Sequence, residues 1–432
     1  MLEKSHVLPQ LNTALIEPLF LIEQHFLSRP QLIADWFKTQ WDLTAPPVYG
    51  SVDLRNAGFK LAPIDMNLFP AGFNNLNPNF LSLAINAAKK IMQQISPQAK
   101  KILIIPESHT RNLFYWENVS ILKKILEEAG FAVQFGFLGE EIKAPHAIEL
   151  TSGEKVIVEP LSRNDDQLML SNFMPDMILL NNDLSEGIPA ILQNIKQPLI
   201  PPAELGWSQR LKSEHFHYYA EVAKEFAAEV KLDPWLISPL FRHCGKIDFM
   251  QQEGMECLIT NATTLFEEIQ QKYAEYHIPY QPFLIIKADA GTYGMAVMTV
   301  RNVEELTSLN RKQRTRMSTT KGGQPVNRVI IQEGIYTFET WGSEQAVAEP
   351  VVYLLGSQVI GGFYRIHKER GIDENLNSPG MQFEPIAFPQ PCNEPCDVSA
   401  PDACKNRLYV YGVIAQLSML AAAREIKDQL TK

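Results

Sequence analysis

The chain has 432 residues, of which 45% are apolar and 20% are charged, and its formal net charge is -10. This length has room for two or three domains, and the composition is that of a folded globular protein. The acidic balance argues against a nucleic-acid partner, because contacts to phosphate need clustered lysine and arginine. One basic run, Arg311 to Arg316, is interpreted as a solvated loop.

No stretch approaches the ~18 uncharged apolar residues of a membrane span, and no apolar export signal follows Glu3 and Lys4. We therefore expect a soluble, cytoplasmic protein without a membrane partner, whose five cysteines are free thiols. Cys392, Cys396 and Cys404 cluster, but their spacing fits no closed zinc site. The sequence leaves the oligomeric state open, a homo-oligomer included.

The first part of the chain predicts an open parallel α/β sheet. Residues 1 to about 45 are predicted to be helical, because Leu19, Ile22 and Phe26 continue one apolar stripe. A buried strand, a helix and a second strand then form a βαβ unit, which further strands and a helix extend. The predicted ranges are 101–105, 118–129 and 131–135 for the unit, and 177–180, 188–195 and 198–200 for the extension. We predict a domain of residues 1–202.

The character of the sequence changes near Pro201 and Pro202, and we predict a second domain of residues 203–432. Two amphipathic helices come first, the second capped by Asn261. Five strands and a terminal helix follow. The predicted helices are 215–230, 262–276 and 408–430, and the predicted strands are 283–287, 295–300, 329–332, 348–355 and 358–366. The chain as a whole is predicted to be of the α/β (α+β) class.

Lys287 ends an apolar strand and is followed by a flap from Gly291 to Gly294. Burying a lysine is unfavourable unless its ammonium meets a negative partner, and small residues let backbone amides close over a phosphate. The pair indicates a clamp for a nucleotide triphosphate, although neither of the common glycine-rich phosphate motifs is present. The alternative, in which Lys287 caps a surface hairpin, stays open.

The parts that follow favour the nucleotide interpretation. Gln332 and Glu333 end a buried strand and could read adenine and ribose, and a tight hairpin from Glu349 ends in Arg365. A later loop offers hard oxygen ligands suited to Mg²⁺. The predicted metal ligands are Glu349, Glu374, Asn375 and Asn377. This order of parts is similar to that of ATP-grasp ligases, in which a Glu-x-Asn metal motif lies on a strand after a long helix, whereas Glu374 and Asn377 precede the terminal helix.

A polar segment at residues 51–76 suits a dicarboxylate amino acid. Arg55 can hold a carboxylate bidentately and Lys60 adds a second positive charge. Asp65 with Asn67 can meet an α-ammonium group. Asn74 and Asn75 add neutral donors and acceptors. The alternative is that the carboxylate and amide side chains cap turns in a loop rich in proline and glycine.

Four segments together resemble the proteobacterial, Thiobacillus-type glutamate–cysteine ligases: 51–76, 205–216, 287–294 and 373–381. The resemblance implies an enzyme that uses ATP and Mg²⁺ to phosphorylate the side-chain carboxylate of glutamate. The cysteine amine then displaces phosphate, which is the first step toward glutathione. Lys287 and Arg365 would neutralise the transferred phosphoryl group, and Lys212 would be a second phosphate-binding lysine.

Glu107, His109 and Arg111 are additional candidates, because they follow the strand at 101–105, where open α/β sheets bind ligands. A solvated loop is the other interpretation. Two functional alternatives also remain. The first is another amino-acid ligase, similar to glutathione synthetase or to a dipeptide ligase. The second is a nucleotide-binding regulator without catalysis.

Overall fold

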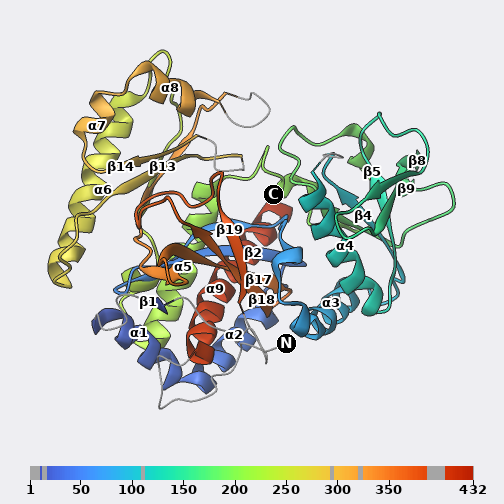
Figure 1. Ribbon diagram of the computed structural model, residues 1–432, viewed down its shortest axis with the longest axis horizontal. Coiled ribbons are helices and arrows are strands. Elements are labelled where there is room, and N and C mark those ends of the chain that lie inside the picture. Colours follow the sequence, from blue (N-terminus) through green and yellow to red (C-terminus); the bar gives the residue numbers. More distant parts are fainter. Residues whose placement is uncertain are drawn as a thin grey trace.

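The computed structural model describes residues 10–11, 17–108, 112–291, 296–319, 325–386 and 404–431. Within these ranges the strands form sheets of seven, six, four and two strands. Figure 1 shows the six-stranded sheet at one side of the molecule and the four-stranded sheet at the other, with the seven-stranded sheet between them. The predicted mixed α/β class is confirmed.

The six-stranded sheet is the predicted open sheet, in the order β11-β10-β4-β5-β7-β6. Its strands pair in parallel, except for β6 at the edge. The apolar run of β4 is buried at every position from Ile102 to Ile105, as expected for a parallel strand covered on both faces. The elements are α3 (Leu81–Ile95), β4 (Lys101–Pro106), α4 (Leu113–Glu128), β5 (Ala132–Phe137), β6 (His146–Glu149), β7 (Lys155–Pro160), β10 (Met177–Asn181) and β11 (Leu199–Ile200). A separate hairpin comprises β8 (Ser162–Asn164) and β9 (Gln167–Met169).

Three predictions in these regions are wrong. The helix at 188–195 is only a 3-10 turn, Ala190–Leu192, because Pro189 precedes it and Asn194 has a φ of 54°. Asn261 is not a cap, since α6 (Met255–Glu275) begins two turns earlier after Gly254, whose φ is 76°. The basic run is not a loop but α8 (Arg311–Ser318), which Asn310 begins with a capping box.

The seven-stranded sheet contains the hairpin that the sequence did not predict. β2 (Tyr49–Asn56) pairs with β17 (Ala346–Leu355) and with β3 (Leu61–Asn67), all antiparallel. The other strands are β1 (Gln10–Leu11), β16 (Glu339–Trp341), β18 (Gln358–His367) and β19 (Gln382–Ile386). The division of the chain at residue 202 stays a prediction, and hydrogen bonding in this sheet joins residues from both sides of it.

The four-stranded sheet has the order β12-β15-β13-β14 and is antiparallel. The predicted hairpin of β13 and β14 is confirmed. Figure 1 shows α6, α7 and α8 beside this sheet. The elements are β12 (Phe241–Cys244), β13 (Leu284–Ala288), β14 (Val297–Val300), α7 (Glu304–Thr307) and β15 (Val329–Glu333). Cys244 and Cys257 are free thiols, as expected, whereas Cys392 and Cys396 lie outside the described residues.

Helices cover the face of the seven-stranded sheet opposite to the cavity described below. The long α9 (Cys404–Leu430) contacts β2, β3, β17 and α5 (Lys212–Val230). Its apolar part, from Leu408 to Ala423, is buried almost throughout. The helical N-terminal region consists of two helices, α1 (Glu17–Leu27) and α2 (Pro30–Leu43), and the second helix begins at a proline. None of the described helices is long and apolar enough to cross a membrane.

A buried ion cluster joins α9 to the segment before α5. Arg210 donates to both oxygens of Glu425, at 2.8 and 2.9 Å, and to the carbonyl of Met66 at 3.0 Å. His215 contacts the same carboxylate at 3.3 Å and Ser418 at 3.1 Å. Burial alone would raise the pKa of Glu425. The opposite effect of Arg210 and His215 is larger, so the pKa is lowered to about 2. The cluster therefore holds a charged pair inside the core.

Glu425→Gln should destabilise the fold, because it leaves the buried guanidinium of Arg210 without its counter-charge. We expect a loss of ~3–5 kcal/mol in the free energy of unfolding at pH 7, measured in urea. Since the pKa of Glu425 is depressed on folding, its contribution is complete above its usual value of 4.5 and is lost as the pH falls toward 2. The difference in free energy of unfolding between the native protein and Glu425→Gln should therefore decrease as the pH falls.

Asp428→Asn is the matched control, since Asp428 lies one turn further along α9 at the exposed surface. It should change stability by less than about 1 kcal/mol. Equal losses of stability in the two variants would show that the buried ion pair contributes no more to stability than an exposed carboxylate does.

Candidate functional site

A cavity of about 970 Å³ lies where three structural units meet. One face of the seven-stranded sheet forms its floor, β13 and β15 form a second wall, and the carboxyl ends of β4 and β10 contribute Glu107 and Asp183. The cavity brings together most of the predicted site residues. Those that line it are Arg55, Asp65, Asn67, Asn74, Asn75, Lys212, Lys287, Gly291, Gln332, Glu333, Glu349, Arg365, Asn375 and Asn377.

Two predicted site residues in the described part of the chain, Lys60 and Glu374, are not among those that line the cavity. Lys60 and Glu374 lie nearby but have other partners, given below. Gly294 lies outside the described residues, as do His109 and Arg111 of the additional candidates. Glu107 does line the cavity.

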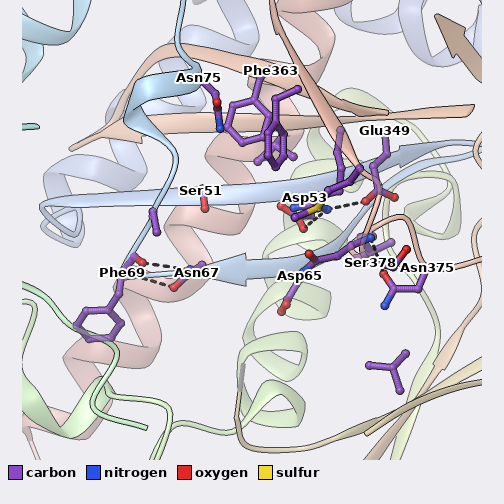
Figure 2. A pocket seen from close by; sticks show the side chains of 18 of the residues that line it. Ser51, Asp53, Asp65, Asn67, Phe69, Asn75, Glu349, Phe363, Asn375 and Ser378 are labelled. Atoms are coloured by element: carbon purple, nitrogen blue, oxygen red, sulfur yellow. Dashed lines mark hydrogen bonds and ion pairs between the residues drawn. The ribbon is translucent and has the colours of Figure 1, made fainter. Parts of the chain in front are cut away.

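Strand register explains why the floor of the cavity is polar. Residues directly opposite one another in an antiparallel pair project to the same face. Asp53 is opposite Asp65, and Ser51 is opposite Asn67. Figure 2 shows that these side chains come from the two strands of one hairpin. Ser51 and Asp53 have no predicted role in the sequence, although polar residues at every second position from Ser51 to Arg55 indicate a strand.

Two arginines enclose one carboxylate in this floor. Glu349 is 1% exposed and accepts from Arg55 at 2.9 Å and from Arg365 at 2.6 Å. Burial raises the pKa of Glu349, but the two guanidinium groups outweigh it, so the net direction is downward. Arg365 also donates to Asp53 at 2.8 Å through the same nitrogen. Its buried Nε has no hydrogen-bond partner among the described residues, so the guanidinium retains hydrogen-bonding capacity that these residues do not use.

Arg55 is a structural link rather than an open cation. Besides Glu349, it donates to the carbonyls of Ile335 and Glu374. The carboxylate of Glu374 accepts from the Gly371 amide at 2.7 Å and from Arg370 at 3.3 Å. Arg55 therefore ties the loop of Glu374 to the sheet.

Two lysines project from different elements toward the same region. Lys287 donates to the side chain of Gln332 at 3.0 Å and to the carbonyl of Ile64 at 2.8 Å. Burial lowers the pKa of Lys287 to about 8, although Asp65 opposes this. Lys212 lies 3.0 Å from Asp65 and 3.8 Å from the centre of the Trp207 ring. The pKa of Asp65 is lowered on balance, since Lys212 and Lys287 outweigh its burial.

The end of β15 presents unsatisfied polar atoms beside these lysines. Gln332 Nε2 and Glu333 Oε1 are buried and have no hydrogen-bond partner among the described residues. The other oxygen of Glu333 is held at 2.7 Å by Lys60 and at 2.9 Å by the Leu240 amide. Lys60 lies over the Trp235 ring, 4.1 Å from its centre, and burial lowers its pKa to about 8. Lys60 therefore orients Glu333 from behind the cavity wall, which leaves one carboxylate oxygen for a ligand.

The described residues contain no cluster of three histidine, cysteine, aspartate or glutamate side chains that could hold a metal ion by itself. A pair of carboxylates is present instead, in Asp53 and Asp65, with the amide of Asn67 on the same face. Burial raises the pKa of Asp53 even though Arg365 opposes this. This carboxylate would therefore gain from another cation.

Comparison with known proteins gives a family for this arrangement. The family GshA, glutamate-cysteine ligase, matches residues 23–426. The crystal structure of a candidate gamma-glutamylcysteine synthetase from Methylobacillus flagellatus KT is 51% identical, with a TM-score of 0.91 over 98% of this chain and 100% of that one.

A glutathione synthetase-like effector from Globodera pallida is 10% identical, with a TM-score of 0.37 over 86% of this chain and 82% of its own. So distant a likeness carries no argument. None of the curated proteins compared matches the chain. The family match and the close relative agree over nearly the whole length, and the chain belongs to the glutamate-cysteine ligase family.

Proposed function

We propose that the cavity is the active site of an ATP-dependent glutamate–cysteine ligase, and that the reaction proceeds through γ-glutamyl phosphate. The observation that supports this most is the meeting, in one cavity, of two lysines with an arginine whose Nε is unpaired. A ligase of this kind must bring a triphosphate and a carboxylate together, and positioned positive charge is what phosphoryl transfer needs.

The nucleotide is assigned to the end of the cavity at β13 and β15. Gln332 and Glu333 offer a donor and an acceptor to adenine and ribose, and Ile285, Val297 and Ile335 give apolar surface there. Lys287 and Lys212 then face the phosphates, with the Gly291 backbone at the start of the flap. The role of Gly294 in the same flap stays a prediction.

Glutamate is assigned to the floor beside Arg365. Asp53 and Glu349 hold one guanidinium nitrogen, so the free part of the group can meet the side-chain carboxylate and the phosphoryl group it receives. A carboxylate oxygen attacks the terminal phosphorus and ADP leaves. The cysteine amine next attacks the acyl carbon, a C–N bond forms, and phosphate departs with the electron pair of the C–O bond. Asn74 and Asn75 provide amides for the amino-acid head groups.

The family implies a divalent metal ion, and we propose Mg²⁺ held by Asp53 and Asp65, beside the Asn67 amide, which is paired with the Phe69 backbone at 2.8 and 3.2 Å. Mg²⁺ in such sites uses one or two carboxylates together with substrate phosphates, which matches the pair on the floor. When bound, it would neutralise charge on the phosphates. The predicted ligand Glu349 is 1% exposed with both oxygens engaged by arginines, whereas the side chains of Asp53 and Asp65 are 20% and 37% exposed. Glu374 is held within its own loop. Asn375 and Asn377 line the cavity, but none of the cavity-lining residues of their loop is acidic.

Asp65-x-Asn67 resembles the Glu-x-Asn metal motif of ATP-grasp ligases, with aspartate in place of glutamate, and β3 contacts α9. These two residues therefore lie on a strand beside the long helix, although in the chain they come first. We also propose a cytoplasmic location and small-molecule substrates only, with a homo-oligomer left open.

The function is tested by measuring ADP release across pairs of amino acids. We expect turnover with glutamate and cysteine, and γ-glutamylcysteine as the product identified by mass. Turnover with another pair but not with this one would indicate a different amino-acid ligase. ATP binding without turnover on any pair would indicate a regulator.

The affinity for ATP should fall as the pH rises through about 8, because Lys287 loses its charge in that range. Binding of a fluorescent ATP analogue without amino acids measures this directly. We expect a loss on the order of tenfold. Lys287→Arg should shift the fall to higher pH, since a guanidinium stays charged. An identical profile in the variant would place the titrating group elsewhere.

Asp65→Asn should raise the Mg²⁺ concentration for half-maximal activity by on the order of tenfold or more. Glu374→Gln is the matched control and should change it less than about twofold. Asp65 is also the ion-pair partner of Lys212. The affinity for nucleotide is therefore measured without metal as well, to correct for the loss of that ion pair. A larger rise in that Mg²⁺ concentration for Glu374→Gln than for Asp65→Asn would indicate that the metal binds in the loop of Glu374 instead.

A further inference from the structure

Three aromatic rings form one side of the cavity, and no role has been given to them above. The aromatic wall consists of Tyr353, Phe363 and Phe383. The rings of Tyr353 and Phe363 are 5.5 Å apart and those of Phe363 and Phe383 are 5.1 Å apart, so the wall is continuous. These are distances at which aromatic rings pack favourably.

The aromatic wall lies next to the reacting groups but away from the nucleotide end. Phe363 and Arg365 are two residues apart on β18 and therefore share a face, about 7 Å apart along the strand. Phe363 is opposite Val351, which in turn is opposite Asp53. Figure 2 shows Phe363 beside Asn75, with Asp53 between them and Asp65.

A close backbone approach fixes the amides over this wall. A Cβ at Gly72 would lie 2.5 Å from the Tyr353 hydroxyl and 3.0 Å from the Phe363 ring. The glycine lets the turn that carries Asn74 and Asn75 pack directly on the rings. Apolar and amide groups are therefore held together at one end of the cavity.

The chemistry of the three substrates determines what this end can bind. Glutamate and the triphosphate are polar or charged, and adenine has its own apolar surface at β13 and β15. The only other weakly polar group is the thiol side chain of the acceptor. We infer that the aromatic wall binds the CH₂–SH group of cysteine and selects it over serine, an inference that rests on the proposed function.

The physical basis of the selection is the difference between a thiol and a hydroxyl. Sulfur is polarisable and makes favourable contacts with aromatic rings. A serine hydroxyl would lose water at this wall, where the rings of Phe363 and Phe383 offer it no hydrogen-bond partner. With the side chain on the wall, the α-amino group of cysteine can reach an acyl carbon held at Arg365, since one amino acid spans that separation.

Phe363→Leu tests the inference, with Phe131→Leu as the matched control. Phe131 is also buried, at 8% exposed against 4% for Phe363, but it directly precedes β5 of the six-stranded sheet and does not line the cavity. The ratio of kcat/KM for cysteine to that for serine should fall on the order of tenfold in Phe363→Leu and stay unchanged in the control. 2-Aminobutyrate replaces SH with CH₃, and its kcat/KM in the native enzyme should lie between those of cysteine and serine. Glutamate activation, measured with hydroxylamine as the acceptor, should be unaffected in both.

The inference is overturned if the ratio is unchanged while KM for glutamate or ATP rises, since the wall would then serve that substrate. Phe383→Leu provides a second reading of the same ratio if Phe363→Leu does not fold, and an unchanged ratio there also counts against the inference. Absence of hydroxamate formation by the native protein is a different result, because it refutes the proposed function itself.

Discussion

The pairing of β2 with β17 is the constraint on which the site depends. Asp53 and Arg55 on one strand meet Glu349 and Arg365 of the β17–β18 hairpin only because residues about 300 positions apart are held in register. The pairing of β2 with β3 then places Asp65 beside Lys212 and near Lys287, and both lysines lower the pKa of Asp65. A shift by one residue would turn every one of these β2 side chains to the opposite face. Register, more than any single contact, therefore assembles the site.

The two faces of this sheet carry ion clusters of different kinds. On the helical face, all three nitrogens of the Arg210 guanidinium and both oxygens of Glu425 have partners. On the cavity side, Arg365 of this sheet and Glu333 of the neighbouring β15 each retain a buried atom without a partner among the described residues. An unsatisfied buried polar group is unfavourable in a structural role. The atoms left unpaired in the cavity are thus where ligands are expected, and the closed cluster is where stability is expected.

The parts of the fold that were predictable are those decided by local sequence. The apolar runs of β4 and β13 identify themselves, and the glycine-containing connection after Lys287 indicates a hairpin. β2 and β3 were missed because their strands are defined by long-range pairing and by alternation within a segment rich in polar residues. The sequence predicts Lys60 as a substrate ligand, since nothing in it shows that Trp235 and Glu333 enclose the side chain. The metal ligands predicted from the sequence differ from those proposed from the structure for the same reason, because Asp53 and Asp65 become neighbours only through the hairpin.

The most direct test is a crystal structure with a non-hydrolysable ATP analogue, Mg²⁺ and glutamate. The account predicts phosphates at Lys287 and Lys212, metal on Asp53 and Asp65, and the glutamate side-chain carboxylate at Arg365. Metal coordinated by Glu374 and Asn377, with the hairpin of β2 and β3 touching neither metal nor glutamate, would contradict it.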